Sequence, residues 1–219
     1  MTDDLYIGRI VAVAKTPSGA LSALYRVSSR SFPNRTAVVH EDRVSIVPKA
    51  GHEGDIQKNP YIAYNCARIV AGNSVAVLTN GSQTDPIAEK IDQGMPVRDA
   101  LVVSHMALDY EKDDYNTPRV SSVIDSRDDS AWLATVREDG LEVRKMPVEP
   151  GKLYYLATYE ENKISPHQSD AFSAEDPVTA ANYILGEGVF AKRRNPITAV
   201  TAVAKDDGFY LHAHDAPTE

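Results

Sequence analysis

Arginine and serine are interleaved over one short stretch of this chain. The stretch reads YRVSSRSFPNR and contains Arg26, Arg30 and Arg35, with Ser28 between the first two. A guanidinium group can donate two parallel hydrogen bonds to a phosphate or a carboxylate, and a serine hydroxyl adds a short donor beside it. The stretch therefore predicts a pocket for a small anion. A solvated strand face and structural ion pairs are the alternatives.

The charge around these arginines differs from that of the whole chain. The formal net charge is -8, yet no Asp or Glu occurs from Leu5 to His40, a stretch that holds Arg9 and Lys15 as well as the three arginines above. The acidic balance disfavours a nucleic-acid backbone or an anionic membrane as the main partner, because each requires a broad basic surface. A small anion held in a local cationic pocket remains compatible with it.

Three further polar clusters contain side chains that could do chemistry. They read NPYIAYNC, NGSQTD and LDYEKDDYNTPR, and they supply Tyr61, Tyr64, Asn65, Asn80, Gly81, Asp85, Glu111 and Lys112 as candidates. Each cluster also has an ordinary structural interpretation. DYEKDD is typical of an exposed acidic turn after a helix, and Asn-Gly is a common turn dipeptide. The two tyrosines and Asn65 would equally suit a core with satisfied polar groups.

Metal, cofactor and nucleophile signals are weak. His212 and His214 lie two residues apart on an expected strand, but no third ligand has a recognisable spacing and no HExxH or CxxC occurs. No glycine-rich phosphate loop is present, so we expect no metal and no cofactor. Cys66 lies in an apolar pattern typical of core packing. Thr2 could act as an N-terminal nucleophile only after loss of Met1, and two acidic residues separate it from the first strand.

Length and composition favour one compact domain over residues 1–219. The chain has 219 residues, of which 42% are hydrophobic, and no linker or repeat interrupts it. Its single cysteine excludes an intramolecular disulfide and suits a reducing interior. No apolar run approaches the roughly 18 residues of a membrane span, and the start MTDDLY lacks the positive charge of a signal peptide. We expect a soluble, cytoplasmic protein without a membrane partner.

The elements that must position these residues begin with strands. Alternating patterns and turn residues predict a hairpin from Leu5–Ala14 and Ala20–Ser28. Further strands are expected at Thr36–His40, Arg43–Pro48, Tyr61–Val70 and Ser74–Thr79. The first third of the chain is therefore predicted to be a meander of antiparallel strands.

Two helices are predicted in the middle of the chain. Asp85 can cap the first, with Pro86 at its first helical position and Gly94 beyond its end. Pro96 opens the second, in which apolar residues recur every three or four positions over Val97–Tyr110. The DYEKDD segment then falls at the exit of this helix.

The second half repeats this layout without repeating the sequence. Strands are expected at Arg119–Asp125, Ala131–Arg137, Leu141–Met146, Leu153–Tyr159, Thr198–Ala204 and Gly208–His214. Between them, a helix is predicted over Glu175–Leu185 with Ser173 as its cap. This order suits an α/β protein of the α+β type, with two packed antiparallel sheets covered outside by helices.

The four polar clusters, in this order, resemble the archaeal IMP cyclohydrolase family. The similarity extends from YIGR at Tyr6 through the final strands, and the four motifs together are specific although no single one is. The resemblance implies a four-layered αββα sandwich similar to that of N-terminal nucleophile hydrolases, without an autoprocessed nucleophile. It also implies closure of 5-formamidoimidazole-4-carboxamide ribotide to IMP with loss of water, without a cofactor.

The resemblance gives each candidate an expected role. Arg26, Arg30 and Arg35, with Ser28, would lie near the phosphate and ribose. Glu111, Lys112 and Tyr64 would move protons, and Asn80 would donate to the oxygen as negative charge develops. Tyr61, Asn65, Gly81 and Asp85 would contact the substrate. The alternatives are an amide hydrolase of the N-terminal nucleophile type and a non-catalytic purine nucleotide-binding module.

A homo-oligomer is also expected from the resemblance. The apolar, tyrosine-rich run Leu153–Tyr159 would then leave one face to be covered by another copy. An ordinary buried strand of the second sheet explains the same pattern equally well.

Overall fold

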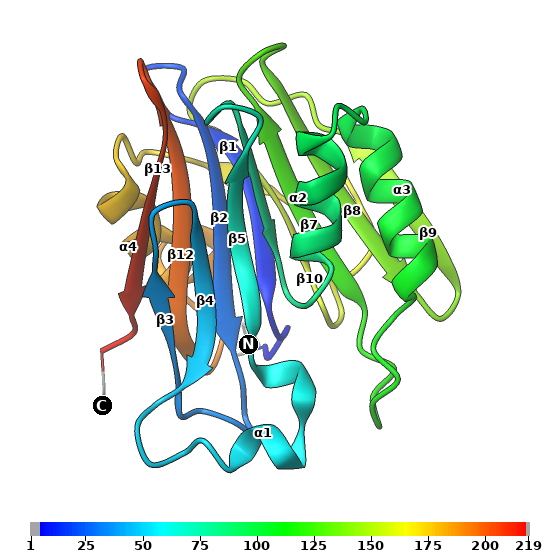
Figure 1. Ribbon diagram of the computed structural model, residues 1–219. Coiled ribbons are helices and arrows are strands. Elements are labelled where there is room, and N and C mark those ends of the chain that lie inside the picture. Colours follow the sequence, from blue (N-terminus) through cyan, green and yellow to red (C-terminus); the bar gives the residue numbers. More distant parts are fainter. Residues whose placement is uncertain (1–4, 218–219) are drawn as a thin grey trace.

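Two antiparallel sheets packed face to face form the centre of the molecule (Figure 1). The computed structural model describes residues 5–217, so Thr2 lies outside the described part. The six-stranded sheet has the order β11 (Ser169–Ala171), β10 (Lys152–Ala157), β1 (Ile10–Lys15), β2 (Leu21–Ser28), β12 (Pro196–Lys205), β13 (Gly208–Asp215). The seven-stranded sheet runs in chain order through β3 (Arg35–Val39), β4 (Arg43–Pro48), β5 (Tyr64–Val70), β6 (Val75–Thr79), β7 (Arg119–Asp125), β8 (Ser130–Arg137), β9 (Gly140–Lys145).

Strand β2 shows how the alternation of side chains builds the layers. Ala23 and Tyr25 pack in the core between the two sheets. Leu24 packs in a separate core on the other side of its sheet, under α4 (Pro177–Gly186). Successive side chains of a strand point to opposite faces, so Arg26 faces outward with Leu24.

Helices cover the outer face of each sheet. α2 (Thr84–Asp92) and α3 (Val97–Leu108) pack on the seven-stranded sheet through a third apolar core that includes Ile87 and Leu101. In Figure 1 these two helices lie on one side of the sandwich and α4 on the other. The expected four-layered αββα sandwich is confirmed. Among residues 5–217, no helix has the length and apolar character needed to cross a membrane.

Three short helical turns complete the fold. They are α1 (Asp55–Lys58), η1 (Pro60–Ile62) and η2 (Gly188–Phe190). The sequence patterns predicted none of them, and η1 replaces the first residues of the strand expected from Tyr61.

The chain changes sheets after β2. Strands β1 and β2 belong to the six-stranded sheet, whereas β3 to β6 belong to the seven-stranded sheet, and residues 29–34 join the two. The first third is therefore not the single meander that the sequence patterns predicted. Alternation reports which strands are half-buried but not which sheet they join.

Two helix starts also differ from the prediction. Helix α2 begins at Thr84, so Asp85 lies inside the first turn and does not cap it. Asp176, rather than Ser173, caps α4 and accepts hydrogen bonds from the backbone N–H groups of residues 178 and 179. The tyrosine-rich run forms β10, which is buried between β1 and β11, so it leaves no open face.

Candidate active site

One end of the sandwich is hollowed where several strands begin or end. Arg9 precedes β1, Ser28 ends β2 and Arg35 begins β3. In antiparallel sheets the end of one strand lies beside the start of the next, which brings these distant residues together. They line a cavity of about 250 Å³ with Tyr6, Ser29, Arg30, Ser31, Phe32, Asn59, Ile62, Glu111, Asp113, Tyr115 and Tyr159.

Residues 29–34 form the cavity wall that links the two sheets. The backbone N–H of Phe32 donates to the Ser29 hydroxyl at 3.0 Å, and Arg35 Nε donates to the Phe32 carbonyl at 3.1 Å. Local side-chain bonds of this kind stabilise a turn against regular structure. The guanidinium carbon of Arg30 lies 4.4 Å from the centroid of the Tyr6 ring, a cation–π distance. The wall thus presents cations and hydroxyl groups to the cavity.

Arg35 carries an unsatisfied donor into this site. Its side chain is buried, and its Nη1 atom has no hydrogen-bond partner among the described residues. Burial lowers the pKa of Arg35, because the charged form loses water. Buried polar atoms without a partner are uncommon, and an anionic ligand would supply one here. Arg9, Arg30 and Arg35 outnumber the two acids of the lining, Glu111 and Asp113, which leaves the cavity an excess of positive charge.

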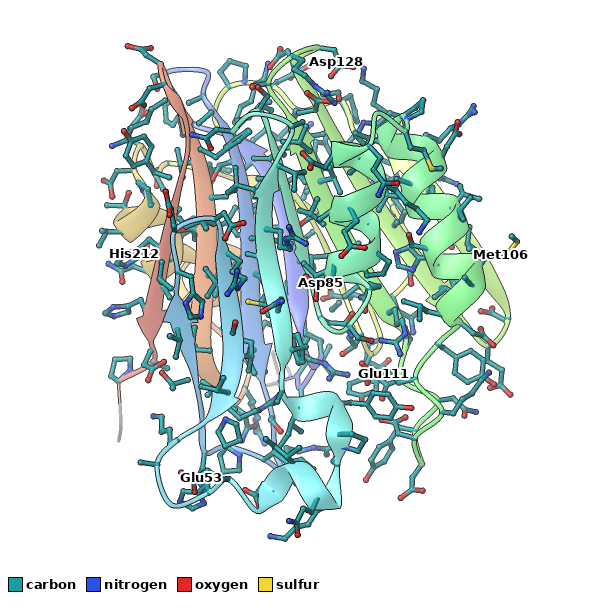
Figure 2. The ribbon with its side chains drawn as sticks, viewed as in Figure 1. Glu53, Asp85, Met106, Glu111, Asp128 and His212 are labelled. Carbon is teal, nitrogen blue, oxygen red and sulfur yellow. The ribbon has the colours of Figure 1, made fainter. Side chains whose placement is uncertain are left out.

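Glu111 is the buried carboxylate of the cavity. It is 1% exposed, and its Oε2 atom accepts a hydrogen bond from Arg9 Nη2 at 3.1 Å. Its Oε1 atom lies 3.7 Å from Arg119 Nη1, which is an ion-pair distance without a hydrogen bond. Burial raises the pKa of Glu111, and the two guanidinium groups oppose that rise. Figure 2 shows Glu111 near one end of the sandwich, just beyond the lower end of α2 and α3.

The loop after α3 holds Glu111 in place. The Glu111 N–H donates to the Thr117 carbonyl at 2.8 Å, and the Asp113 carboxylate accepts from the Thr117 N–H and hydroxyl at 2.9 and 2.7 Å. The Thr117 hydroxyl also lies 2.9 Å from Tyr159 Oη. These bonds fix the loop to the segment after β10, on the opposite sheet.

Two phenols meet between the sheets near these arginines. The hydroxyl groups of Tyr25 and Tyr64 lie 2.5 Å apart. Burial raises the pKa of both tyrosines, while the charge of Arg9 lowers it. Both phenols are therefore neutral donors at neutral pH, and neither belongs to the cavity lining.

Four of the predicted site residues line the cavity together, namely Ser28, Arg30, Arg35 and Glu111. Tyr61 is adjacent, with its ring centroid 5.8 Å from the guanidinium carbon of Arg119. The arginine-rich stretch and the DYEKDD segment, which are far apart in the sequence, thus meet in one site.

Arg26 lies elsewhere, contrary to the sequence-based expectation. Its fully buried guanidinium faces outward from β2 and donates to backbone carbonyls that include Leu185 at 3.0 Å and Arg194 at 3.2 Å. Burial and the nearby charge of Arg193 lower the pKa of Arg26 to about 10. The physical reason is strand alternation, which places it on the face opposite Tyr25.

Asn80 and Lys112 also lie outside the cavity lining. The amide of Asn80 is fully buried and used internally: it donates to the Pro118 carbonyl at 3.0 Å and accepts from the Val120 N–H at 2.8 Å. It is therefore not placed to donate to an oxyanion in the cavity. Lys112 is exposed and pairs with Asp109 at 2.6 Å, outside the cavity lining.

Asn65 and Asp85 bond to each other rather than to the cavity. Asn65 Nδ2 donates to both Asp85 carboxylate oxygens at 3.1 Å, and Arg68 lies 3.5 Å from the same carboxylate. Gly81 stands behind Glu111: a Cβ atom added there would lie 3.1 Å from Glu111 Oε1. This proximity explains a glycine at that position.

Sequence reasoning missed Arg9 and Arg119 as site residues. Arg9 belongs to the acid-free stretch and to YIGR, and Arg119 belongs to DYNTPR, but neither was given a specific role. Their position at the start of a buried strand was the available signal, since Arg9 directly precedes β1 and Arg119 is the first residue of β7. Within residues 5–217, no group of three or more metal-ligating side chains lies together, and the rings of His212 and His214 stack at 6.3 Å. Cys66 is buried, which raises the pKa of its thiol.

Comparisons with known proteins agree with one family over nearly the whole chain. A family model described as IMP cyclohydrolase-like protein matches residues 6–208. A protein of Methanosphaera stadtmanae named IMP cyclohydrolase is 43% identical over 93% of this chain and 96% of its own length. Proteins with the same name from Methanocella arvoryzae and Methanococcus maripaludis are each 46% identical, over 97% and 94% of this chain and 100% and 98% of their own lengths.

Proposed function

This chain belongs to the IMP cyclohydrolase family, and we propose that its cavity closes 5-formamidoimidazole-4-carboxamide ribotide to IMP with loss of water. The observation that supports this site most directly is the buried Glu111 carboxylate beside a surplus of arginines. A proton acceptor and a phosphate-binding wall are the two features that this reaction requires.

The phosphate is assigned to the wall formed by residues 29–34 and by Arg35. Arg30 lines the cavity with its guanidinium over the Tyr6 ring, and Arg35 Nη1 offers its unsatisfied donor. Serine hydroxyls at positions 28, 29 and 31 add donors beside these two cations. Charge-assisted hydrogen bonds from guanidinium groups suit a phosphate dianion.

Glu111 is assigned the role of general base. The carboxamide nitrogen attacks the formyl carbon, so a C–N bond forms while the nitrogen gives one proton to Glu111 and the formyl oxygen gains one. Glu111 then passes its proton to the hydroxyl group of the adduct, which leaves as water. The proton on the former formamide nitrogen leaves as the C=N bond forms, and it balances the one that the formyl oxygen gained first. Arg9, bonded to Glu111, is placed to face negative charge on the formyl oxygen.

The substrate itself meets much of the entropic cost of this reaction. Both reacting groups stand on one imidazole ring, so the protein has to hold them coplanar and manage protons. Lys112 is left out of this proposal because its ammonium pairs with Asp109 at the surface.

The test is turnover by the purified protein, followed by absorbance as IMP forms. Glu111→Gln is expected to lower turnover by about two orders of magnitude while nucleotide binding persists, the usual scale for a lost general base. Asp114→Asn makes the same chemical change on an exposed residue of the same loop and should leave turnover unchanged. If well-folded wild-type protein does not catalyse ring closure, the assignment is wrong.

Three finer features are proposed with this function. The αββα sandwich is related to that of N-terminal nucleophile hydrolases, the protein works in the cytoplasm, and it forms a homo-oligomer whose cavities are each lined by one chain. Exposed apolar side chains on α3, with Met106 at 69% exposure, support an interface on that helix (Figure 2). A monomer mass by light scattering at micromolar concentration would contradict the assembly and leave the catalytic assignment intact.

A further inference from the structure

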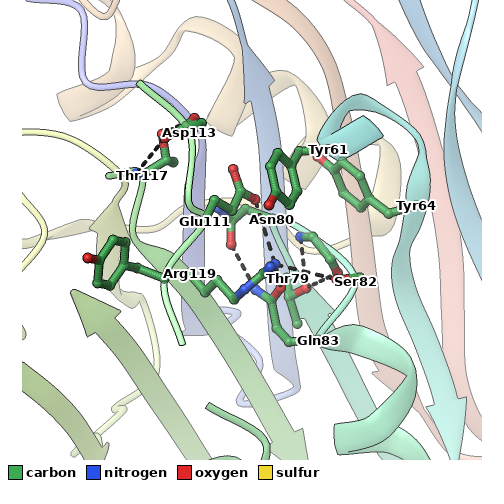
Figure 3. A network of polar contacts seen from close by, with 12 residues as sticks. Tyr61, Tyr64, Thr79, Asn80, Ser82, Gln83, Glu111, Asp113, Thr117 and Arg119 are labelled. Atoms are coloured by element: carbon green, nitrogen blue, oxygen red, sulfur yellow. Dashed lines mark hydrogen bonds and ion pairs between the residues drawn. The ribbon is translucent and has the colours of Figure 1, made fainter. Parts of the chain in front are cut away.

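A chain of buried amide and guanidinium groups ends at Glu111. Asn80 Oδ1 accepts a hydrogen bond from Gln83 Nε2 at 2.8 Å, and Gln83 Oε1 accepts one from Arg119 Nη1 at 3.1 Å. Arg119 Nη1 in turn faces Glu111 Oε1 at 3.7 Å. Figure 3 shows these four side chains as one connected network. None of the first three lines the cavity, and Glu111 is the lining residue with which Arg119 forms an ion pair.

The amide orientations in this chain are fixed by the backbone. Asn80 Oδ1 also accepts from the Val120 N–H, and Gln83 Nε2 also donates to the Val120 carbonyl at 3.3 Å. With Nε2 committed in that direction, Gln83 presents its oxygen to Arg119. Because Asn80 and Gln83 are fully buried, turning either amide would leave a donor facing a donor.

Arg119 is held on its other side as well. Its Nε donates to the Asp109 carbonyl at 2.8 Å, where α3 ends, and Ser82 Oγ lies 3.5 Å from Nη1. The guanidinium is therefore fixed at three points around the loop that carries Glu111. Gly81 leaves the room for this arrangement, because a Cβ there would lie 2.9 Å from both Arg119 Nη1 and Gln83 Oε1.

We propose that Arg119, oriented by the Asn80–Gln83 amide pair, is a positioning residue that keeps Glu111 ionised and correctly aimed for proton abstraction. This inference rests on the proposed function for the role of Glu111, but not for the link between the two side chains. Asn80 lies at the far end of the network, where it orients Gln83. This role differs from that of the oxyanion donor expected from the sequence.

The charges around Glu111 set the sign of the expected effect. Arg9 faces it from the segment before β1, Arg119 faces it from β7, and Asp113 lies on its own loop. The other charged or titratable groups of the lining are Arg30, Arg35 and the phenols of Tyr6, Tyr115 and Tyr159. Burial favours the protonated acid and the two guanidinium groups favour the carboxylate, so removing one of them must move ionisation to higher pH.

The experiment compares pH profiles of kcat/KM for matched variants. In Arg119→Gln, the acid limb of the kcat/KM profile is expected to move to higher pH. The decrease in kcat/KM relative to the wild type should be roughly tenfold greater at pH 6 than at pH 8. Arg119→Lys keeps the charge and should keep the limb near its wild-type position. Arg98→Gln removes an exposed arginine that pairs only with its neighbour Asp99, so its profile should match the wild type.

Further measurements separate this inference from folding and from the assigned reaction. If Arg119→Gln does not fold, Gln83→Leu removes the acceptor that holds Arg119 and retains every charge, and it should move the limb in the same direction. The infrared carboxylate band lost in Glu111→Gln reports the titration of Glu111 without turnover. The proposal is wrong if folded variants keep both the wild-type acid limb and the wild-type titration of Glu111. This holds even if the wild type makes IMP. Wild-type protein without turnover, but with a Glu111 titration that responds to Arg119, would refute only the assigned reaction.

Discussion

His105 is expected to make the fold sensitive to acid. It lies on α3, fully buried against the seven-stranded sheet, with Nε2 at 2.9 Å from Ser121 Oγ and with Nδ1 lacking a hydrogen-bond partner in the described chain. Burial, and then the charge of Arg119, lower the pKa of His105 from 6.5 to about 3. The folded state therefore holds a neutral imidazole throughout the mildly acidic range.

The sign and size follow from proton linkage. Below pH 6.5 the unfolded chain binds a proton at His105 and the folded chain does not, so stability is present above that pH and is lost as the pH falls toward 3. At 1.36 kcal/mol for each pKa unit, the loss from this group between pH 8 and pH 5 is about 2 kcal/mol. This loss depends mainly on the pKa of His105 in the unfolded chain, because at pH 5 the imidazole of the folded chain is still almost wholly neutral.

Urea unfolding followed by the fluorescence of Trp132, the single tryptophan, measures this loss. Other acids and bases also titrate, so the wild type and His105→Gln are compared. For each protein the free energy of unfolding at pH 5 is subtracted from that at pH 8, and the excess in the wild type is the contribution of His105. His167→Gln changes an exposed histidine and should behave as wild type. If His105→Gln loses as much stability between the two pH values as the wild type does, the burial argument is wrong.

Three other substitutions test the site and its surroundings. Gly81→Ala should fold, since the backbone at this position needs no glycine. It should lower kcat about tenfold or more, because the added methyl group pushes Arg119 from Glu111, and unchanged kinetics would contradict that contact. Arg30→Ala should weaken binding of a phosphorylated ligand about tenfold and that of the free nucleoside little, as titration calorimetry would show; equal losses would place Arg30 away from the phosphate. Arg26→Ala should cost about 3–5 kcal/mol in urea unfolding because several buried carbonyls lose their donor, and a near-neutral result would contradict its structural role.

Much of the fold could be predicted because its determinants are local. Alternation and turn residues gave strands such as β7 at its exact bounds, and they gave three helices with errors of a few residues at their ends. The change of sheet at residues 29–34 could not be predicted in this way, because it depends on which strand pairs with which.

The site was predictable to the extent that polar residues stood apart from the strand pattern. Arg30, Arg35 and Glu111 belong to loops or strand ends, where a charged side chain signals a use. Arg26 was misplaced because one residue along a strand reverses its face, and composition does not record the face. Asn80 was misassigned because only three-dimensional packing shows that its amide is already satisfied by Val120 and its neighbours.

The linker between the two sheets has a consequence for the energetics of binding. Arg9 is attached to one sheet and Arg35 to the other, and residues 29–34 join them at the mouth of the cavity. An anion that contacts both arginines connects the two sheets beside the linker that joins them at that wall. At a concentration a hundred times its dissociation constant, such a ligand would add about 2.7 kcal/mol to the unfolding free energy. Bound substrate would thus stabilise the fold reversibly, and a melting temperature that rises with substrate concentration would report the occupancy of the cavity.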